Sequence, residues 1–289
     1  MKVLITGAAG LVGRAATQYC AAQGDDVFSF DHHTLDITDA SALRTVFNER
    51  RPDVVINCAA WTDVDGCESD PAHAERANAL GPELLASSCR ETDALLITIS
   101  TDYVFDGTKE GFYTQRDQPN PVSVYGRSKV EGERRAQSAW ARTIVVRSGY
   151  IFGNGGKNFM STLLSRAARN EPLKAISDMA GTPTYAPDLA QRLRALAALD
   201  LPGVFHVVNA GDGASFETFA RTALQMAGLS SAALDTVTLS DLHRAAARPR
   251  NSRLRCLWSE ALRLDPLPHW VDALHTFVKS HSGSQSASV

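Results

Sequence analysis

A phenol and an ammonium group stand four positions apart at Tyr125 and Lys129, in a stretch, 124–139, whose composition favours a helix. Side chains at this spacing lie on one face of a helix, so the two groups can approach each other. A free tyrosine titrates near pH ~10, too high for efficient proton transfer at neutral pH, and a neighbouring cation lowers that pKa. Most such pairs on helices only pack or face solvent. The context of this pair therefore decides whether it is a candidate proton donor.

Polar side chains at two predicted strand ends supply that context. Ser-Thr-Asp-Tyr, 100–103, closes the predicted strand 95–100, and the Thr101 hydroxyl could hydrogen-bond a carbonyl oxygen while Tyr125 protonates it. Residues 57–62 close the preceding strand with small side chains that would let a cofactor lie close. Ligands of parallel α/β sheets bind outside the carboxyl ends of the strands, so both segments are candidates for one site.

Glycines at positions 7, 10 and 13 follow the first predicted strand, 2–6, and open the first predicted helix, 11–23. Their missing side chains let the backbone turn sharply and approach a diphosphate, which would sit where free N–H groups of the helix favour negative charge. A glycine pattern alone is weak, and a tight turn without a ligand is the alternative. The strand–turn–helix context makes it a prediction of dinucleotide binding.

The acidic residue that such a motif requires is Asp31, which ends the second predicted strand eighteen residues beyond Gly13. A carboxylate there can hold a ribose 2′-OH and would repel a 2′-phosphate, which favours NADH over NADPH. His32 and His33 follow directly and weaken that repulsion. The alternative is an exposed carboxylate at a strand end with no ligand.

The elements that must position these groups alternate along the first half of the chain. Short apolar runs predict buried strands at 2–6, 27–30, 54–57, 95–100 and 143–147. Longer segments rich in Ala, Leu, Arg and Glu predict helices at 11–23, 41–48, 74–90 and 124–139. This alternation predicts an α/β fold of the Rossmann type, a doubly wound parallel sheet with helices on both faces.

After residue 149 the alternation loosens, as expected of a segment that covers a substrate. Helices are predicted at 159–170, 187–199 and 216–227, and a strand at 204–209. A dinucleotide-binding domain is expected at 1–149, with parts of 187–212 returning to it. A smaller, mainly substrate-binding C-terminal lobe is expected at 150–279, and the Ser-rich segment 280–289 is expected to be a flexible tail.

The composition excludes several classes of protein. With 289 residues, 44% of them hydrophobic and 21% charged, the chain is too apolar for disorder. A net charge of −3 argues against a nucleic-acid or membrane-surface partner. Five scattered cysteines without a C-x-x-C pair, and no clustered histidines, predict neither a disulfide framework nor a metal site. No apolar run could span a membrane and no secretion signal is recognisable, so a cytoplasmic protein is expected.

With these motifs in view, the chain resembles the dTDP-4-dehydrorhamnose reductase family of extended short-chain dehydrogenases/reductases. The most family-specific run is 100–107, Ser-Thr-Asp-Tyr-Val-Phe-Asp-Gly. The other matching segments are 7–13, 36–39, 57–62 with 64–65, 125–129 with 132–133, 157–159, 181–184 and 248–254. Together they span residues 3–275, nearly the whole chain.

The resemblance implies NADPH- or NADH-dependent reduction of the C4 ketone of a nucleotide-linked deoxysugar, from dTDP-4-dehydro-L-rhamnose to dTDP-L-rhamnose. It implies that Tyr125 is the proton donor, Lys129 its pKa partner and a ribose ligand, and Thr101 the hydroxyl that usually is a serine. The implied cofactor contacts, from the diphosphate through adenosine to nicotinamide, are Gly7, Gly10, Leu11, Val12, Asp31, Asp36, Ile37, Ala59, Ala60, Trp61, Thr62, Tyr125 and Lys129. The implied substrate contacts are Thr101, Asp102, Tyr150, Asn158 and Arg253.

Two departures from the family pattern bear on the sugar. Tyr150 stands where the family tends to have Trp, and Met179 stands where it tends to have Gln. An epimerase or dehydratase on the same scaffold is an alternative, although dehydratases usually carry Glu where this chain has Tyr103. A dinucleotide-binding regulatory subunit, like the β subunit of methionine adenosyltransferase, is another. The oligomeric state is open, with a homodimer as one option.

Overall fold

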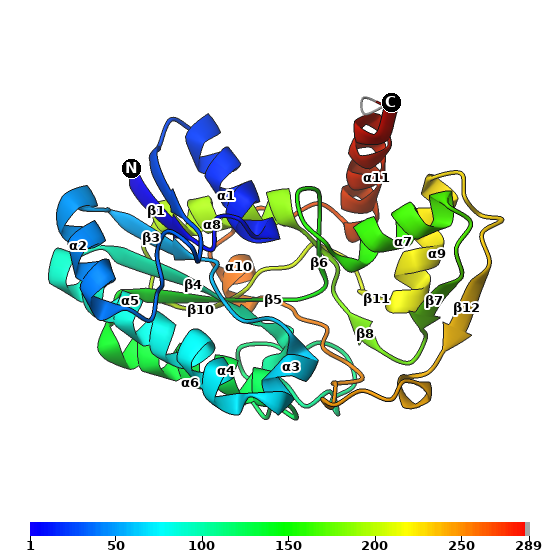
Figure 1. Ribbon diagram of the computed structural model, residues 1–289, viewed down its shortest axis with the longest axis horizontal. Coiled ribbons are helices and arrows are strands. Elements are labelled where there is room, and N and C mark those ends of the chain that lie inside the picture. Colours follow the sequence, from blue (N-terminus) through cyan, green and yellow to red (C-terminus); the bar gives the residue numbers. More distant parts are fainter. Residues whose placement is uncertain (287–289) are drawn as a thin grey trace.

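The computed structural model describes residues 1–286, with side chains as far as His281. Its centre is a parallel sheet in the order β10-β5-β4-β3-β1-β2 (Figure 1). The six strands are β1 (Lys2–Thr6), β2 (Asp26–Phe30), β3 (Val54–Asn57), β4 (Leu95–Thr101), β5 (Thr143–Ser148) and β10 (Gly203–His206). This strand order confirms the predicted α/β fold with a doubly wound parallel sheet. Strand β10, which comes late in the chain, lies at the edge of the sheet beside β5.

Helices cover both faces of the sheet. One face carries α1 (Leu11–Ala22) and α8 (Ala186–Leu199), and the other carries α2 (Ala40–Arg50), α5 (Gly81–Thr92) and α6 (Val124–Ala139) (Figure 1). Successive strand residues point to opposite faces, so Val3 and Ile5 pack toward α1 and α8 while Leu4 packs toward α2 and α5. Burial on both faces is the reason that these strands are continuous apolar runs.

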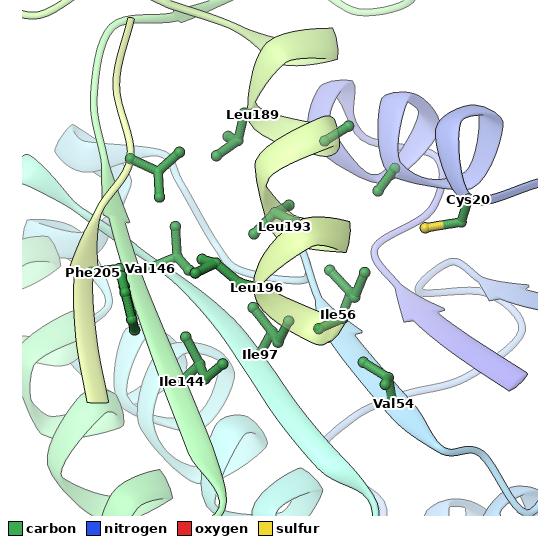
Figure 2. Close-up of a cluster of buried hydrophobic side chains, with 14 of the residues drawn as sticks. Cys20, Val54, Ile56, Ile97, Ile144, Val146, Leu189, Leu193, Leu196 and Phe205 are labelled. Carbon is green, nitrogen blue, oxygen red and sulfur yellow. The ribbon is translucent and has the colours of Figure 1, made fainter. Parts of the chain in front are cut away.

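The core between α8 and the sheet is drawn in Figure 2. Leu189, Leu193 and Leu196 of α8 lie over Ile56, Ile97 and other strand residues, and all five side chains are fully buried. The leucines are spaced by four and three residues, which places them on one stripe of the helix. This packing fixes the sheet whose carboxyl edge carries the predicted polar residues.

A second, smaller layer of elements follows β5 and has its own core. It contains short paired strands and three helices (Figure 1). Their buried core includes Phe152, Phe219 and Phe277. Its strands are β6 (Ile151–Phe152), β7 (Leu173–Ile176), β8 (Ala180–Gly181), β9 (Thr184–Tyr185), β11 (Ala214–Ser215) and β12 (Leu234–Val237). Its helices are α7 (Phe159–Ala168), α9 (Phe216–Met226) and α11 (Trp270–Ser286). The division of the chain into two functional domains stays a prediction.

Several predicted boundaries change. The predicted helix 74–90 is three pieces, α4 (Pro71–Glu75), a π-helical turn (Arg76–Leu80) and α5. The predicted strand 204–209 is the shorter β10. Helix α11 includes 280–286, where a flexible tail was predicted, and residues 287–289 lie outside the described residues. Short helices α3 (Val64–Ser69) and α10 (Leu257–Ala261) were not predicted.

No helix of the described chain is both long and apolar enough to cross a bilayer.

Candidate active site

A long cleft runs along the carboxyl edge of the central sheet. It consists of two adjoining hollows of about 550 and 480 Å³ that share Gly10, Cys58 and Ala60 in their walls. The first lies at the ends of β1, β2 and β3, and the second at the ends of β4 and β5. Sixteen of the eighteen residues predicted to bind cofactor or substrate line one or both hollows.

The glycine turn forms the floor between the two hollows. Gly7 has a φ of +66°, and a Cβ there would lie 2.6 Å from the Ala59 nitrogen. A Cβ at Gly13 would lie 2.2 Å from the Gly7 carbonyl oxygen. Gly10 precedes α1 without a side chain to cap the helix, so the first turn of α1 presents its N–H groups to the cleft. These features fit a diphosphate, which needs close backbone approach and N–H donors.

Asp31 lies at the end of β2 in the larger hollow. Its Oδ1 accepts bonds from the backbone N–H groups of His33 and Thr34, both at 3.0 Å, and from the Thr34 hydroxyl. The Thr34 hydroxyl and these N–H groups lower the pKa of Asp31. The carboxylate is therefore charged and oriented by its own turn.

Two basic side chains that sequence analysis missed also line this hollow. Arg76 donates to the Thr38 hydroxyl at 3.1 Å, and the His73 ring lies edge-on to Trp61 at 4.5 Å. Both come from the helical segment after β3, and nothing in their local sequence indicates a binding role. Arg76 places positive charge at the end of the cleft where Asp31 lies.

Tyr125 and Lys129 lie buried in the second hollow, on the first turns of α6. The Ser123 side chain caps this helix by accepting from the Gly126 N–H. Burial raises the pKa of Tyr125, a hydrogen bond with the Thr101 hydroxyl opposes that rise, and the nearby charge of Asp102 adds to it. The lowering of the phenol pKa that the sequence predicted from Lys129 is therefore not what this arrangement produces.

The reason is the position of the Lys129 ammonium. Its Nζ donates to the Ile99 carbonyl oxygen at 2.7 Å, at the end of β4. Burial lowers its pKa from 10.5 to about 8, and the charge of Glu133 partly opposes this. Phenol and ammonium thus share one hollow, with the ammonium tied to the strand.

Asp102 is the second buried acid of this hollow, and it has a partner that the sequence did not reveal. Its carboxylate accepts from the Thr101 hydroxyl at 3.1 Å and from the Ser252 hydroxyl at 2.5 Å. A Cβ at Gly149 would lie 2.4 Å from this carboxylate, so glycine there makes room for it. Burial raises the pKa of Asp102 to about 6, although both hydroxyls oppose the rise.

This shifted pKa predicts a pH-dependent change in stability. A carboxyl whose folded pKa lies above its unfolded value stabilises the protein fully below the unfolded pKa, and that contribution is lost as pH rises through about 6. Asp102→Asn should therefore raise the free energy of unfolding by about 1–2 kcal/mol at neutral pH, allowing for one weakened hydroxyl bond, and not at acidic pH. Urea unfolding on both sides of the Asp102 pKa measures this difference.

Asp106→Asn is the matched control. Hydrogen bonds from Thr108, Asn120 and Tyr113 lower the pKa of Asp106, so its loss should destabilise the protein at neutral pH. If both variants changed stability in the same direction at neutral pH, the account of Asp102 would be wrong.

The far end of the cleft meets a third hollow, of about 210 Å³. Tyr150, a non-glycine residue with a φ of +47°, stacks on Phe216 at 4.2 Å and donates to the Met179 carbonyl oxygen at 3.2 Å. The third hollow is lined by apolar, aromatic and basic side chains that include Tyr103, Phe159, Met179, Phe216, Arg244 and Arg248. Arg248 is anchored by two bonds to Asp65 of α3, at 2.6 and 3.0 Å.

Two predicted substrate residues lie elsewhere. The Asn158 side chain accepts from the Ser161 N–H and donates to two backbone carbonyl oxygens, so it caps α7. Arg253 donates to Asn251 at 2.9 Å and lies over the Phe112 ring. Neither lines the cleft. Arg248, which belongs to the same sequence motif as Arg253, faces the third hollow instead.

Comparisons with known proteins agree with this geometry. A family model described as "RmlD substrate binding domain" matches residues 1–282. The dTDP-4-dehydrorhamnose reductase of Streptomyces griseus is 39% identical over 94% of this chain and 91% of its own length. The enzyme of that name from Mycobacterium tuberculosis H37Rv is 38% identical over 99% of this chain and 95% of its own.

A solved structure extends the likeness to three dimensions. The dTDP-4-dehydrorhamnose reductase of Bacillus anthracis, crystallised in complex with NADP, has a TM-score of 0.93 at 32% identity and covers 97% of this chain and 100% of its own. Matches of this extent over the whole described fold show that the chain belongs to the RmlD family, the family of the dTDP-4-dehydrorhamnose reductases.

Proposed function

We propose that the protein is an NAD(P)H-dependent oxidoreductase that reduces the C4 ketone of a nucleotide-linked deoxysugar, converting dTDP-4-dehydro-L-rhamnose into dTDP-L-rhamnose. The observation that carries the proposal is the convergence of Tyr125, Lys129 and Thr101 on one hollow, which adjoins the glycine turn. The names of the relatives support the same activity.

The cleft has the shape and the donors that a nicotinamide dinucleotide requires. The diphosphate would lie against Gly10, Leu11 and Val12, at the N-terminus of α1. The adenosine half would lie in the hollow lined by Asp31, Asp36 and Ile37, and the nicotinamide half beside residues 59–62. When bound, the reduced nicotinamide supplies the hydride.

The protein's side chains would transfer the proton and orient the ketone. Tyr125 holds the proton that is delivered to the oxygen at C4, and its neighbour Thr101 orients that oxygen. The Lys129 ammonium, which donates to the Ile99 carbonyl oxygen in this structure, would supply the positive charge that makes loss of the phenol proton easier when the ligands are bound. In this structure the Thr101 hydroxyl donates its one proton to the Asp102 carboxylate, so it would turn that proton to the ketone oxygen when the substrate binds.

The nucleotide part of the substrate would occupy the third hollow. Aromatic faces of Phe159 and Phe216 suit a base, and the guanidinium groups of Arg244 and Arg248 suit a diphosphate. Of the two departures from the family pattern, Met179 lines this hollow and Tyr150 lines the second hollow together with Asp102, and the Tyr150 hydroxyl donates to the Met179 carbonyl oxygen. We therefore assign them to the sugar.

Preference for NADH over NADPH should depend on the charge of Asp31. Asp31→Asn keeps the acceptor oxygen for the turn but removes the negative charge that would repel a 2′-phosphate. We expect kcat/KM with NADPH, relative to NADH, to rise about tenfold. Asp26→Asn, at the opposite end of β2, is the control and should leave the ratio unchanged. If the ratio of kcat/KM with NADPH to that with NADH did not change in Asp31→Asn, Asp31 would not be a cofactor-binding residue.

The function is tested by mixing the pure protein with NADH or NADPH and then adding a dTDP-4-keto-6-deoxysugar. Oxidation of the dinucleotide only after the sugar is added is the expected result. Dinucleotide binding without oxidation would instead favour a different sugar or a regulatory subunit, and loss of water from a 4-hydroxy sugar would favour a dehydratase. Absence of dinucleotide binding would refute the proposal.

A further inference from the structure

A buried ion pair joins β5 to α6 one helical turn beyond Lys129. Arg147 of β5 donates to both carboxylate oxygens of Glu133 on α6, at 2.6 and 2.9 Å. The Ser100 hydroxyl, at the end of β4, donates to the same carboxylate at 2.5 Å. The side chains of both charged partners are only 7% exposed. Three elements that carry active-site residues thus meet at one carboxylate.

Fold stability alone gives little reason for this arrangement. Removing two charges from water costs about as much as their attraction returns, and apolar side chains of similar volume often stabilise a core as well or better. The position is specific, however, because Glu133 follows Lys129 by one helical turn on the same face of α6. Ser100 directly precedes Thr101, and Arg147 directly precedes Ser148. Both Thr101 and Ser148 line the second hollow.

Lys129 needs a nearby negative charge. The Lys129 residue is 4% exposed, and its ammonium donates to a neutral carbonyl oxygen. Burial of a cation favours loss of its proton. Among the groups that act on it, the carboxylate of Glu133 opposes that loss. Arg147 without Glu133 would have the opposite effect, since it would place a second buried cation close by.

We propose that Glu133 is a positioning residue that keeps the Lys129 ammonium charged, and that Arg147 and Ser100 hold the Glu133 carboxylate in place for this task. The proposal rests on the role given to Lys129 in the proposed function. Arg147 orients the Glu133 carboxylate through two hydrogen bonds. The negative charge of that carboxylate then acts on the Lys129 ammonium across one turn of helix.

The other titratable groups around the two residues do not replace this charge. Tyr125 on α6 and Cys58 after β3 both face Lys129, and burial raises the pKa of each, so both are neutral at neutral pH. His206 of β10 pairs in register with Arg147, and burial followed by the charge of Arg147 lowers its pKa to about 4, so it is neutral too. The charge of Asp102 acts on Tyr125.

The inference can be tested directly because the chain has six lysines. In protein labelled with ¹³C at the lysine Cε, each ammonium titrates as a separate NMR signal, and Lys129→Met identifies the signal of Lys129. In the ligand-free wild type, we expect Lys129 to titrate well below the other lysines. Glu133→Gln should lower its midpoint by about one further pH unit, because Arg147 then acts alone.

Two further variants separate this effect from a purely structural one. Arg147→Met leaves Glu133 without its partner, so the midpoint of Lys129 should rise above that of wild type. Glu133→Gln combined with Arg147→Met removes both charges, and the midpoint should fall between those of wild type and Glu133→Gln. The order of midpoints is measurable from any pair of variants that folds, and one midpoint shared by all folded variants would overturn the proposal.

Kinetics distinguish failure of this proposal from failure of the proposed function. If wild type reduces the ketone, the alkaline limb of its pH–rate profile should move to lower pH in Glu133→Gln and to higher pH in Arg147→Met. A reductase whose limb does not move would retain its function and refute the role of Glu133. If the protein reduces no ketone but the Lys129 titration midpoints of the variants follow the predicted order, the proposed function is refuted and the effect of Glu133 on Lys129 stands.

Discussion

Replacing Tyr125 with phenylalanine is expected to lower kcat for ketone reduction by about 10²–10⁴-fold, the usual contribution of a positioned proton donor. The phenol is buried beside Thr101 in the hollow that adjoins the glycine turn, and phenylalanine would fill the same volume without a proton to give. Because the glycine turn and the residues around Asp31 are untouched, dinucleotide affinity should stay close to that of wild type.

Steady-state rates together with a dinucleotide titration measure both parts of this prediction. Tyr19→Phe is the matched control, since Tyr19 lies on α1 outside the walls of the cleft and should keep full activity. A Tyr125→Phe variant with wild-type turnover would show that another group donates the proton. A variant that loses dinucleotide binding as well would show that the phenol supports the site structurally.

Replacing Gly13 with alanine is expected to destabilise the protein by about 3 kcal/mol or more and to abolish dinucleotide binding. The added methyl group would lie 2.2 Å from the Gly7 carbonyl oxygen and 2.8 Å from the Ala8 Cα. Both are backbone atoms held by β1 and its neighbours, so α1 would have to move away from the sheet. That movement would also displace the N–H groups proposed to hold the diphosphate.

Gly24→Ala is the control for this variant. Gly24 ends the same strand–helix unit with a φ of +78°, and a Cβ there meets nothing within 4 Å. Gly24→Ala should lower the free energy of unfolding by only about 1 kcal/mol, because alanine is strained in the left-handed backbone conformation. Dinucleotide binding should remain intact. Urea unfolding and a dinucleotide titration of both variants test the prediction. Equal losses in the two variants would mean that close packing at Gly13 is not what the turn requires.

Much of the cofactor half of the cleft could be predicted from the sequence, because its signals are local. Strands buried on both faces appear as apolar runs, and Gly7, Asp31 and residues 59–62 follow such runs directly. In a parallel sheet every strand end reaches the same edge, so placing residues at strand ends also places them in one cleft.

The rest of the site depends on contacts that no local pattern encodes. Ser252 bonds to Asp102 across 150 positions, Arg248 to Asp65 across 183, and Arg76 lies on a helix whose sequence indicates only helix formation. Asn158 fits the sequence pattern expected of it, but its side chain is used by the helix that it caps. Long-range packing decides which member of a motif faces the cleft.

The most direct test of the central claim is the fate of a deuterium label. The protein would be supplied with reduced dinucleotide carrying deuterium at C4 of the nicotinamide, in separate samples for each face of the ring, and with a dTDP-4-keto-6-deoxysugar. Mass spectrometry and NMR of the sugar product would then locate the label. The account predicts a 4-hydroxy sugar that carries deuterium at C4 from one of the two samples. A 4-hydroxy sugar without label from either sample, or an unreduced ketone beside bound dinucleotide, would contradict it.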